Sequence, residues 1–228
     1  MDATLQLHLS EQLYVRDPER TELGRRIVDA SIRLMDRLGL ERFTFKKLAD
    51  EIGSTEASVY RYFENKHRLL VYLVSWYWAW IDYRIQFHTH NVADPRERLR
   101  SVVAVLAEST TYDPSFAHVD EAALHRIVVV ESGKVYHATS VDADNEVGLF
   151  AGYKAVCNTI ARHISEIAPA YPYPRALAST IIEASHQQVF FAQHLPSLTE
   201  VKLAEENPYR PVADFLLDLL GRPLETEL

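Results

Sequence analysis

The segment from Phe45 to Phe63 spaces small and apolar residues in a way that suits one kind of chemistry, the reading of DNA base edges. Counted from Phe45, positions four, five, eight, nine and fifteen are held by Leu48, Ala49, Ile52, Gly53 and Val59. The alanine lets a second helix cross closely above the first. The glycine suits a tight turn, because a positive φ costs little energy only in glycine. The three larger side chains fill the wedge between the helices. The spacing predicts a helix-turn-helix whose second helix enters the major groove with its N-terminal residues at base edges.

No spacing typical of catalysis accompanies this motif. The chain has 10 histidines, yet it contains no His-Glu-x-x-His, Gly-x-Ser-x-Gly, Gly-x-Gly-x-x-Gly or Walker-type loop. His88 and His90 lie two residues apart, so on a helix their side chains diverge instead of converging on a metal. A tetrahedral metal site needs ligands that converge on one point, and the spacing of the histidines does not indicate such a set. We therefore expect no enzymatic activity, no cofactor and no metal site.

Charge is distributed unevenly along the 228 residues. The net charge is -8, which is unfavourable for binding DNA. Residues 21–68 nevertheless carry 10 Lys+Arg against 8 Asp+Glu, whereas residues 69–228 carry 12 against 20. This asymmetry favours a small DNA-binding head on an acidic body that stays away from DNA.

Several features favour a cytoplasmic location. The single cysteine, Cys157, cannot form an intramolecular disulfide and suits a reducing interior. The N-terminus lacks the basic and apolar regions of a signal peptide. The longest uncharged apolar stretch, Leu69 to Ile81, has 13 residues, fewer than the roughly 20 that span a bilayer. We expect a cytoplasmic protein that does not bind membranes.

Helices must position these residues. With 7 glycines and no Asn-Gly, Asp-Gly or Gly-Gly pair, the chain lacks the residues that hairpin turns require. Apolar residues recur at three- and four-residue spacing from Thr21 onward. Helices are expected over residues 21–38, 45–52, 55–63, 66–87, 95–108, 119–131, 146–167, 175–195 and 208–220, the last closed by Gly221 and Pro223. An irregular connection is expected over residues 133–145.

The predicted fold is all-α, with a three-helix helix-turn-helix head plus a larger C-terminal helical bundle, about nine helices in total. We expect an N-terminal arm over residues 1–20, a DNA-binding domain over residues 21–66, and a ligand-binding and dimerisation domain over residues 67–228. The arm has leucines scattered through a polar sequence. It is therefore either docked on the head or a frayed tail.

The head resembles that of the TetR family of transcriptional regulators. The resemblance is carried by FTFKKLADEIG at residues 43–53, ASVYRYFENK at residues 57–66, and Leu69-Leu70. It covers about residues 21–70, and beyond them it depends on length and helix layout. It implies a homodimer with one head on each half-site of a near-palindromic operator. It also implies a ligand cavity in the body whose occupancy changes the spacing of the heads, and we expect a repressor.

The resemblance assigns DNA contacts to particular side chains. The Thr44 hydroxyl, the Tyr60 and Tyr62 phenols and the Lys66 ammonium would meet phosphates, and Arg61 would read a base edge or pair with a phosphate. The full set is Thr44, Lys46, Ser54, Thr55, Glu56, Ala57, Ser58, Tyr60, Arg61, Tyr62 and Lys66.

Three of these residues have alternative interpretations. Many family members carry a basic residue or a proline where this chain has Glu56, and a carboxylate repels phosphate, although it can accept from a cytosine amino group. Base reading is therefore expected to depend on Ser58 and Arg61 more than on the first turn. Lys46 is alternatively an ordinary solvated side chain, and Tyr62 alternatively packs against the first helix.

The body is rich in aromatic residues and histidines. An aromatic-lined cavity with a few polar groups is the usual form of a small-molecule site. The predicted ligand-binding residues are Trp76, Trp80, Tyr83, His125, Tyr153, His186 and Phe190. We expect an apolar or aromatic ligand, with His125, Tyr153 or His186 as polar anchors. Alternatively, these side chains only fill a core, and the regulator is controlled by a protein partner or has no effector.

Two apolar stripes near the C-terminus favour pairing of two chains. The predicted dimer residues are Ile181, Ser185, Val189, Val212, Phe215, Leu216 and Leu219. Two such helices can form a four-helix bundle with their symmetry mates. The alternative is that they close the core of their own chain.

Overall fold

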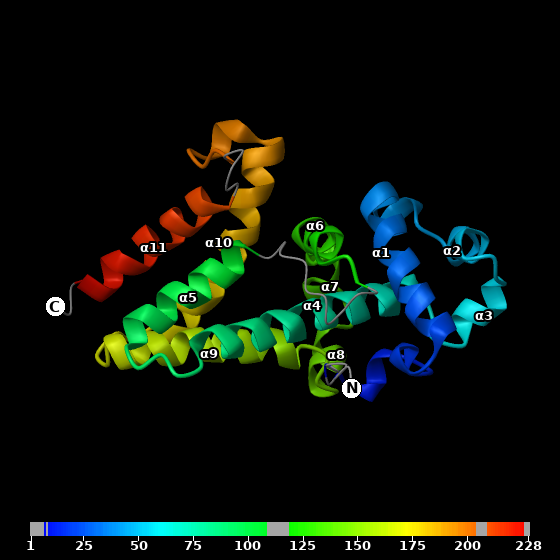
Figure 1. Ribbon diagram of the computed structural model, residues 1–228, viewed down its shortest axis with the longest axis horizontal. Helices are drawn as coiled ribbons and strands as arrows, with labels where there is room; N and C mark the ends of the chain where they lie inside the picture. Colours follow the sequence, from blue (N-terminus) through cyan, green and yellow to red (C-terminus); the bar gives the residue numbers. More distant parts are fainter. Residues whose placement is uncertain (1–6, 8, 109–118, 204–208, 226–228) are drawn as a thin grey trace. The chain divides into compact units, whose positions relative to one another are not determined.

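The structure, a computed structural model, describes residues 7, 9–108, 119–203 and 209–225 (Figure 1). The described residues form eleven α-helices and no strand, which confirms the all-α prediction. The helices are α1 Glu22–Arg42, α2 Phe45–Glu51, α3 Glu56–Tyr60, α4 Lys66–Thr89, α5 Pro95–Ala107, α6 Glu121–Glu131, α7 Gly133–Tyr136, α8 Val141–Glu146, α9 Ala151–Ile167, α10 Pro174–His194 and α11 Arg210–Glu225. Short 3-10 turns add η1 Glu11–Leu13, η2 Pro18–Arg20 and η4 Pro196–Leu198.

The chain folds into two compact units. Unit 1 comprises Met1–Ala79 and Thr110–Gly152, and unit 2 comprises Trp80–Ser109 and Tyr153–Leu228. Helix α4 contributes its first part to unit 1 and its last part to unit 2. None of the helices in the described residues is long and apolar enough to cross a membrane.

Threonines begin the three helices of the head. The hydroxyls of Thr21, Thr44 and Thr55 accept backbone N–H groups of the first turns of α1, α2 and α3 at 3.0, 3.2 and 3.2 Å. Such N-caps satisfy donors that have no partner within the helix. Gly39 has φ 71° and marks a kink near the end of α1, where the sequence predicted the stop.

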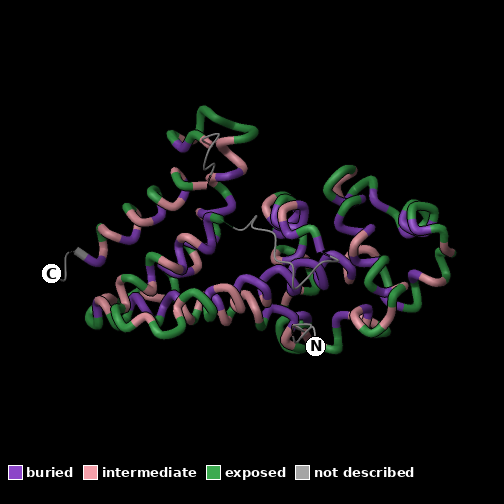
Figure 2. Tube along the Cα trace, viewed as in Figure 1, coloured by how far each residue is buried: buried purple, intermediate pink, exposed green. Residues whose placement is uncertain are grey.

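The wedge between α2 and α3 is closed as the spacing predicts. Leu48, Ala49, Ile52 and Val59 are all buried. Gly53, between the two helices, has φ 59°, in the left-handed region that favours glycine. The helix-turn-helix is therefore formed by residues 45–60, and α4 begins at Lys66 beside it, with every residue from Leu69 to Trp78 buried (Figure 2).

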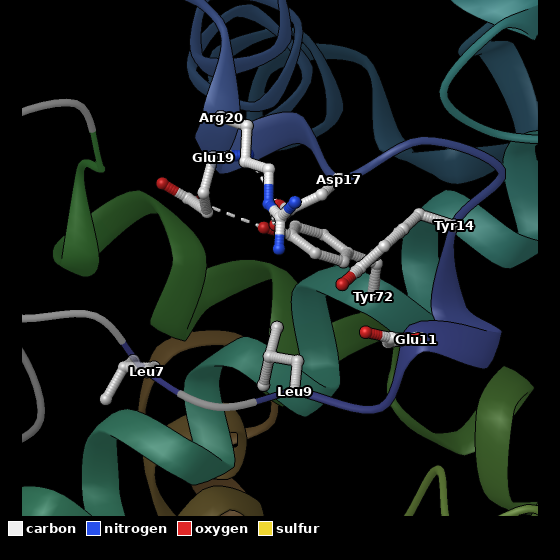
Figure 3. A pocket seen from close by; sticks show the side chains of 8 residues that line it. All are labelled: Leu7, Leu9, Glu11, Tyr14, Asp17, Glu19, Arg20 and Tyr72. Carbon is white, nitrogen blue, oxygen red and sulfur yellow. Dashed lines mark hydrogen bonds and ion pairs between the residues drawn. The ribbon is translucent and has the colours of Figure 1, made fainter.

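The described part of the N-terminal arm is docked on unit 1. Leu13 and Pro18 are buried, and the Val15 N–H donates to the Tyr62 carbonyl at 2.8 Å. The Tyr72 hydroxyl donates to Glu19 at 3.0 Å (Figure 3). These contacts favour the docked alternative for residues 9–20. Residues 1–6 and 8 lie outside the described part.

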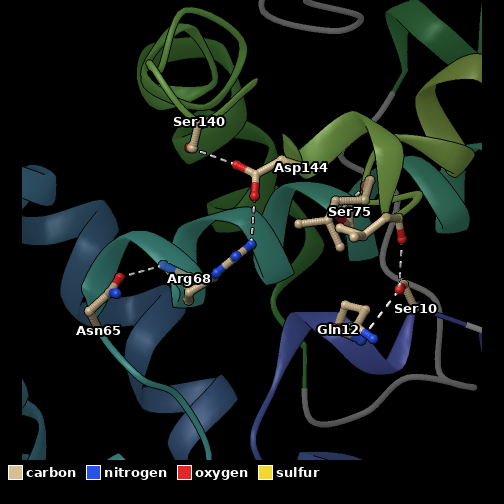
Figure 4. Close-up of polar contacts among 9 residues, drawn as sticks. Ser10, Gln12, Asn65, Arg68, Ser75, Ser140 and Asp144 are labelled. Carbon is tan, nitrogen blue, oxygen red and sulfur yellow. Dashed lines mark hydrogen bonds and ion pairs between the residues drawn. The ribbon is translucent and has the colours of Figure 1, made fainter. Parts of the chain in front are cut away.

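The connection over residues 133–145 was wrongly predicted to be irregular. It contains α7 and α8, which raise the helix count from about nine to eleven. Asp144 on α8 is buried and accepts from Arg68 on α4 and from Ser140, both at 2.8 Å (Figure 4). This contact joins residues 76 positions apart. Tertiary contacts of this kind decide the structure of the segment, and local sequence does not reveal them.

Unit 2 packs α11 against α5 and α10, and an ion pair between Arg98 and Glu166 joins α5 to α9. The last helix was wrongly predicted to end at Leu220. Helix α11 continues to Glu225 with Pro223 inside its last turn. Leu220 and Leu224 are both buried, so burial of that turn outweighs the backbone hydrogen bond that a proline cannot make. The predicted start, Pro208, lies outside the described residues.

Candidate DNA-binding site

The recognition helix presents its first turn to solvent. Thr55, Glu56 and Ala57 are exposed, whereas Val59 on the opposite side is buried. The hydroxyls of Thr55 and Ser58 lie 2.8 Å apart and share a hydrogen bond. Ser54 and Ser58 are half-buried. The surface available to a base edge therefore combines small groups and hydroxyls with one carboxylate, that of Glu56.

Tyr60 and Arg61 extend this surface at the end of the helix. Tyr60 is 48% exposed although its ring rests edge-on against Phe45, with centroids 5.0 Å apart. Packing one side of the ring limits its freedom and so lowers the entropic cost of a contact made by the hydroxyl. Arg61 is exposed and has no ion pair within the described residues. Both side chains are at the surface of the motif, and their contacts with DNA stay a prediction.

The flank of α2 adds two more polar groups. Thr44 and Lys46 are exposed. The neighbouring Lys47 donates its ammonium to the Arg42 carbonyl at 2.7 Å. Lys46 has no hydrogen-bonding partner among the described residues, so its charge is available to a ligand, whereas that of Lys47 is engaged.

Lys66 is half-buried at the start of α4. Its Nζ donates to the carbonyls of Leu40 and Glu41 at 3.0 and 3.3 Å, at the end of α1. A cation at a helix C-terminus is favourable there. The side chain therefore stabilises the junction of α1 and α4, and its predicted phosphate contact must share the ammonium with this role.

Tyr62 lies in the core instead of on the DNA-facing surface. It is 2% exposed, and its hydroxyl lies 2.8 Å from that of Thr21. The Arg16 guanidinium covers the ring at 5.6 Å from the centroid. This geometry favours the packing alternative for Tyr62, so it is left out of the interface proposed below.

Sequence reasoning missed two arginines that hold the motif. Arg26 on α1 donates to the Ile52 carbonyl at 2.5 Å, directly at the turn between α2 and α3. Arg37 pairs with Glu51 at 3.1 Å and neutralises a carboxylate on α2. Neither arginine belongs to the motif spacing. Their position on the polar side of the α1 pattern was the only signal, and it does not distinguish them from solvated side chains.

The predicted ligand-binding residues are divided between the units. In unit 1, Trp76 and His125 are buried, and the His125 ring lies 3.1 Å from the Tyr77 hydroxyl. In unit 2, the Tyr153 hydroxyl donates to Glu183 at 2.8 Å, and burial raises the pKa of that phenol. Trp80 and His186 are buried in unit 2, and Tyr83 and Phe190 are half-buried. The ligand site stays a prediction.

Most of the predicted dimer residues are buried within the single chain. Ile181, Ser185, Val189, Val212 and Leu216 are covered where α10, α11 and α5 pack. Phe215 is 36% exposed and Leu219 is half-buried. The buried stripe lies in the core of unit 2, and the dimer surface stays a prediction. Phe215 and Leu219 are left at the surface of α11.

Comparison with known proteins agrees with this architecture. Residues 27–73 match the bacterial regulatory proteins of the tetR family. The nucleoid occlusion factor SlmA of Haemophilus influenzae is 27% identical over 81 residues, which are 36% of this chain and 37% of that protein. The match thus spans little more than a third of the relative's length.

Two solved structures share the fold over most of the chain. A putative TetR-family transcriptional regulator from Syntrophomonas wolfei has a TM-score of 0.65 at 14% identity, covering 91% of this chain and 98% of that one. AibR in complex with isovaleryl coenzyme A and operator DNA has a TM-score of 0.57 at 16% identity, covering 87% and 97%. The chain thus shares the all-helical fold of these structures, and its helix-turn-helix head lies in the part that matches. Residues 27–73 match the tetR family of bacterial regulatory proteins.

Proposed function

We propose that this protein is a repressor that binds a near-palindromic operator as a homodimer and is released by a small apolar or aromatic ligand. The observation that carries the proposal is the exposed polar face of the helix-turn-helix. Its turn contains Gly53 with a left-handed φ of 59°, and neither Lys46 nor Arg61 forms an ion pair with another described residue. The proposed interface comprises Thr44, Lys46, Ser54, Thr55, Glu56, Ala57, Ser58, Tyr60, Arg61 and Lys66.

Each contact in this interface has a distinct task. Thr44, Lys46, Tyr60 and Lys66 bind phosphates, which fixes the position of the head without reading sequence. Ser58 and Arg61 read base edges. Glu56 lies at the groove-facing end of α3, where a carboxylate favours a cytosine amino group and disfavours close phosphates. The operator is therefore expected to place a cytosine near Glu56 in each half-site.

A homodimer follows from the weak charge of one head. Residues 21–68 have a net charge of only +2, so one head gains little from counterion release. Two linked heads raise the effective concentration of the second at its half-site. We place the dimer surface on the exposed side of α11, around Phe215 and Leu219, because their neighbours Val212 and Leu216 are already buried in the single chain.

The effector is proposed to bind in the body, residues 67–228, and not in the head, residues 21–66, or the arm, residues 1–20. The crystal structure of AibR holds both isovaleryl coenzyme A and operator DNA, which supports the pairing of these two functions on this fold. The aromatic residues predicted to bind the ligand favour an apolar or aromatic group in it. The protein is expected to act in the cytoplasm and without catalysis.

Selection of bound sequences from random DNA tests the proposal. The purified full-length chain is expected to enrich a palindrome. Arg61→Ala is expected to weaken binding to it by about tenfold, the loss of one charge-assisted contact. Arg33→Ala is the matched control, because Arg33 is exposed on α1 and pairs only with Asp29. No enriched sequence at low salt, or an equal loss in Arg33→Ala, contradicts the proposed DNA-binding face.

A further inference from the structure

A polar pocket of about 530 Å³ opens in unit 2, on residues that take no part in DNA binding. Helix α9 contributes Asn158, Thr159, Arg162 and Ser165, and α10 contributes Pro174 and Arg175. The lining contains no carboxylate and no aromatic ring. Its size is within the range of small-molecule sites, but its polar lining differs from the aromatic residues predicted to bind the effector.

The two arginines of this pocket are unpaired. Neither Arg162 nor Arg175 forms a side-chain hydrogen bond or ion pair with another described residue. Other arginines of the same unit are paired, for example Arg98 with Glu166 and Arg222 with Asp218. Unit 2 is acidic overall, with 13 Asp+Glu against 10 Lys+Arg. Two free guanidinium groups at one pocket are therefore not the result of a shortage of carboxylates.

Both guanidinium groups line this one pocket and are exposed, so both are accessible to an anion. Guanidinium groups bind phosphate oxygens in bidentate geometry, which is stronger and more directional than a single ammonium contact. The hydroxyl of Thr159 and the amide of Asn158 add neutral hydrogen-bonding groups at the same wall. The positive end of the 21-residue helix α10 lies at Arg175, and its N-cap residue supplies no side-chain cap.

The wall of the pocket is held in place before any ligand arrives. Pro172 and Pro174 stiffen the link between α9 and α10. The rings of Tyr171 and Tyr173 meet edge-on with centroids 6.3 Å apart. The Cys157 thiol donates to the Arg175 carbonyl at 3.7 Å and so ties the start of α10 to α9. A preorganised site has less entropy to lose on binding.

We propose that this pocket binds a small phosphate-bearing anion of about the size of a diphosphate. Two guanidinium groups on opposite helices match two phosphate groups better than one. This site goes beyond the proposed operator binding and uses no residue of the head and none of the predicted effector-binding residues. It would give the regulator a second input with a charged ligand, distinct from the apolar one.

Calorimetric titration of the full-length protein at low salt tests the site, with pyrophosphate and ADP as probes and inorganic phosphate and sulfate as comparisons. We expect saturable binding of one pyrophosphate per chain. Arg162→Gln and Arg175→Gln are each expected to weaken it by about tenfold or more, consistent with the loss of one bidentate pair. Arg100→Gln, which removes an exposed arginine already paired with Glu97, is expected to bind like the wild type.

Three results overturn the proposal. The first is the absence of saturable pyrophosphate binding at millimolar concentration, and the second is an equal loss in Arg100→Gln. The third is loss of pyrophosphate binding in Arg61→Ala, which would place the anion on the DNA-binding face. Tighter binding of ADP than of pyrophosphate supports the site and adds the nucleoside to the recognised groups. Circular dichroism of each variant checks that the helices are intact.

Discussion

At the scale of single residues, Gly53 sets the geometry of the DNA-binding motif. Its φ of 59° is left-handed, but an added Cβ meets no atom within 4 Å. Gly53→Ala should therefore cost only the backbone strain, about 1–2 kcal/mol, and displace the recognition helix. We expect a lower unfolding midpoint in urea together with weaker operator binding.

Gly133→Ala is the control for this change. Gly133 begins α7 without a positive φ, and its added Cβ approaches His137 no closer than 3.8 Å. The variant should be as stable as the wild type or slightly more so, since alanine favours helix. Equal destabilisation of both variants would show that the conformation of Gly53 is not what matters.

Tyr60 and Tyr62 form a matched pair for separating recognition from stability. The Tyr60 ring is about half exposed, whereas the Tyr62 hydroxyl is bonded to Thr21 in the core. Tyr60→Phe should weaken operator binding by about 0.5–1.5 kcal/mol and leave stability unchanged. Tyr62→Phe should lower stability by a similar amount with little further effect on DNA. Binding isotherms and urea unfolding curves measure both, and the reversed pattern would return Tyr62 to the interface.

His186 makes stability depend on pH. It is buried in α10, and burial lowers the pKa of its imidazole to about 4. The unfolded chain binds the proton near pH 6.5, whereas the folded chain resists it. The contribution of His186 to the free energy of unfolding is therefore present in full above pH 6.5. It is lost as pH falls toward 4, by up to about 1.4 kcal/mol per pH unit. Urea midpoints at pH 7.0 and 5.5 should differ less in His186→Gln, and an unchanged difference would exclude this histidine as a cause. His163, whose pKa burial also lowers, acts in the same direction.

At the scale of elements, helices α1 and α6 are joined by a buried carboxylate. Glu131 on α6 accepts the Leu40 N–H at 2.9 Å, just after the kink at Gly39, and pairs with Lys134 at 2.9 Å. Lys134 also reaches Glu41 at 2.8 Å. A second link, from Arg126 to Asp36, is bidentate at 2.8 and 2.9 Å. The end of α1 is therefore fixed to α6 by polar contacts and not only by apolar packing.

Removing this carboxylate should loosen the head. Glu131→Ala leaves a buried N–H without a partner, which costs about 1–3 kcal/mol. Glu131→Gln retains an acceptor and should cost less, and the exposed Glu146→Ala should cost almost nothing. Hydrogen exchange at the end of α1 is expected to rise in the order Gln, then Ala. If both Glu131 variants have the same urea unfolding midpoint as Glu146→Ala, the contact between Glu131 and the Leu40 N–H does not stabilise α1.

The elements that sequence predicted well are those determined by local pattern. The motif from Phe45 to Val59 follows from spacing, a glycine turn and threonine caps, all of which operate within a few residues. Helices α7 and α8 were missed because the Arg68–Asp144 contact joins distant positions. The placement of Tyr62 likewise depends on Thr21, 41 residues earlier. Proline and glycine were given too much weight at the end of α11, where burial of Leu224 decides the outcome.

At the scale of the whole molecule, charge and dimerisation are linked. The net charge of -8 works against DNA binding, and the head offsets it only slightly. In the proposed homodimer, affinity would therefore come from two heads acting together. The slope of log affinity against log salt concentration should become shallower by about 0.9 for each phosphate contact that is removed. A substitution in a dimer removes the contact from both heads, so it should change the slope twice as much as in a single head.

Phe215→Glu is the change that tests this dependence. A carboxylate at the exposed position of α11 should prevent two chains from pairing there, because its desolvation in an apolar interface is unfavourable. Sedimentation should show a monomer, and operator binding should fall by at least about tenfold as the benefit of linkage is lost. Phe87→Glu is the matched control, since Phe87 is also an exposed phenylalanine of unit 2 but lies on α4. A Phe215→Glu protein that remains dimeric, with unchanged affinity, would move the dimer surface away from α11 while leaving the DNA-binding face of the head as proposed.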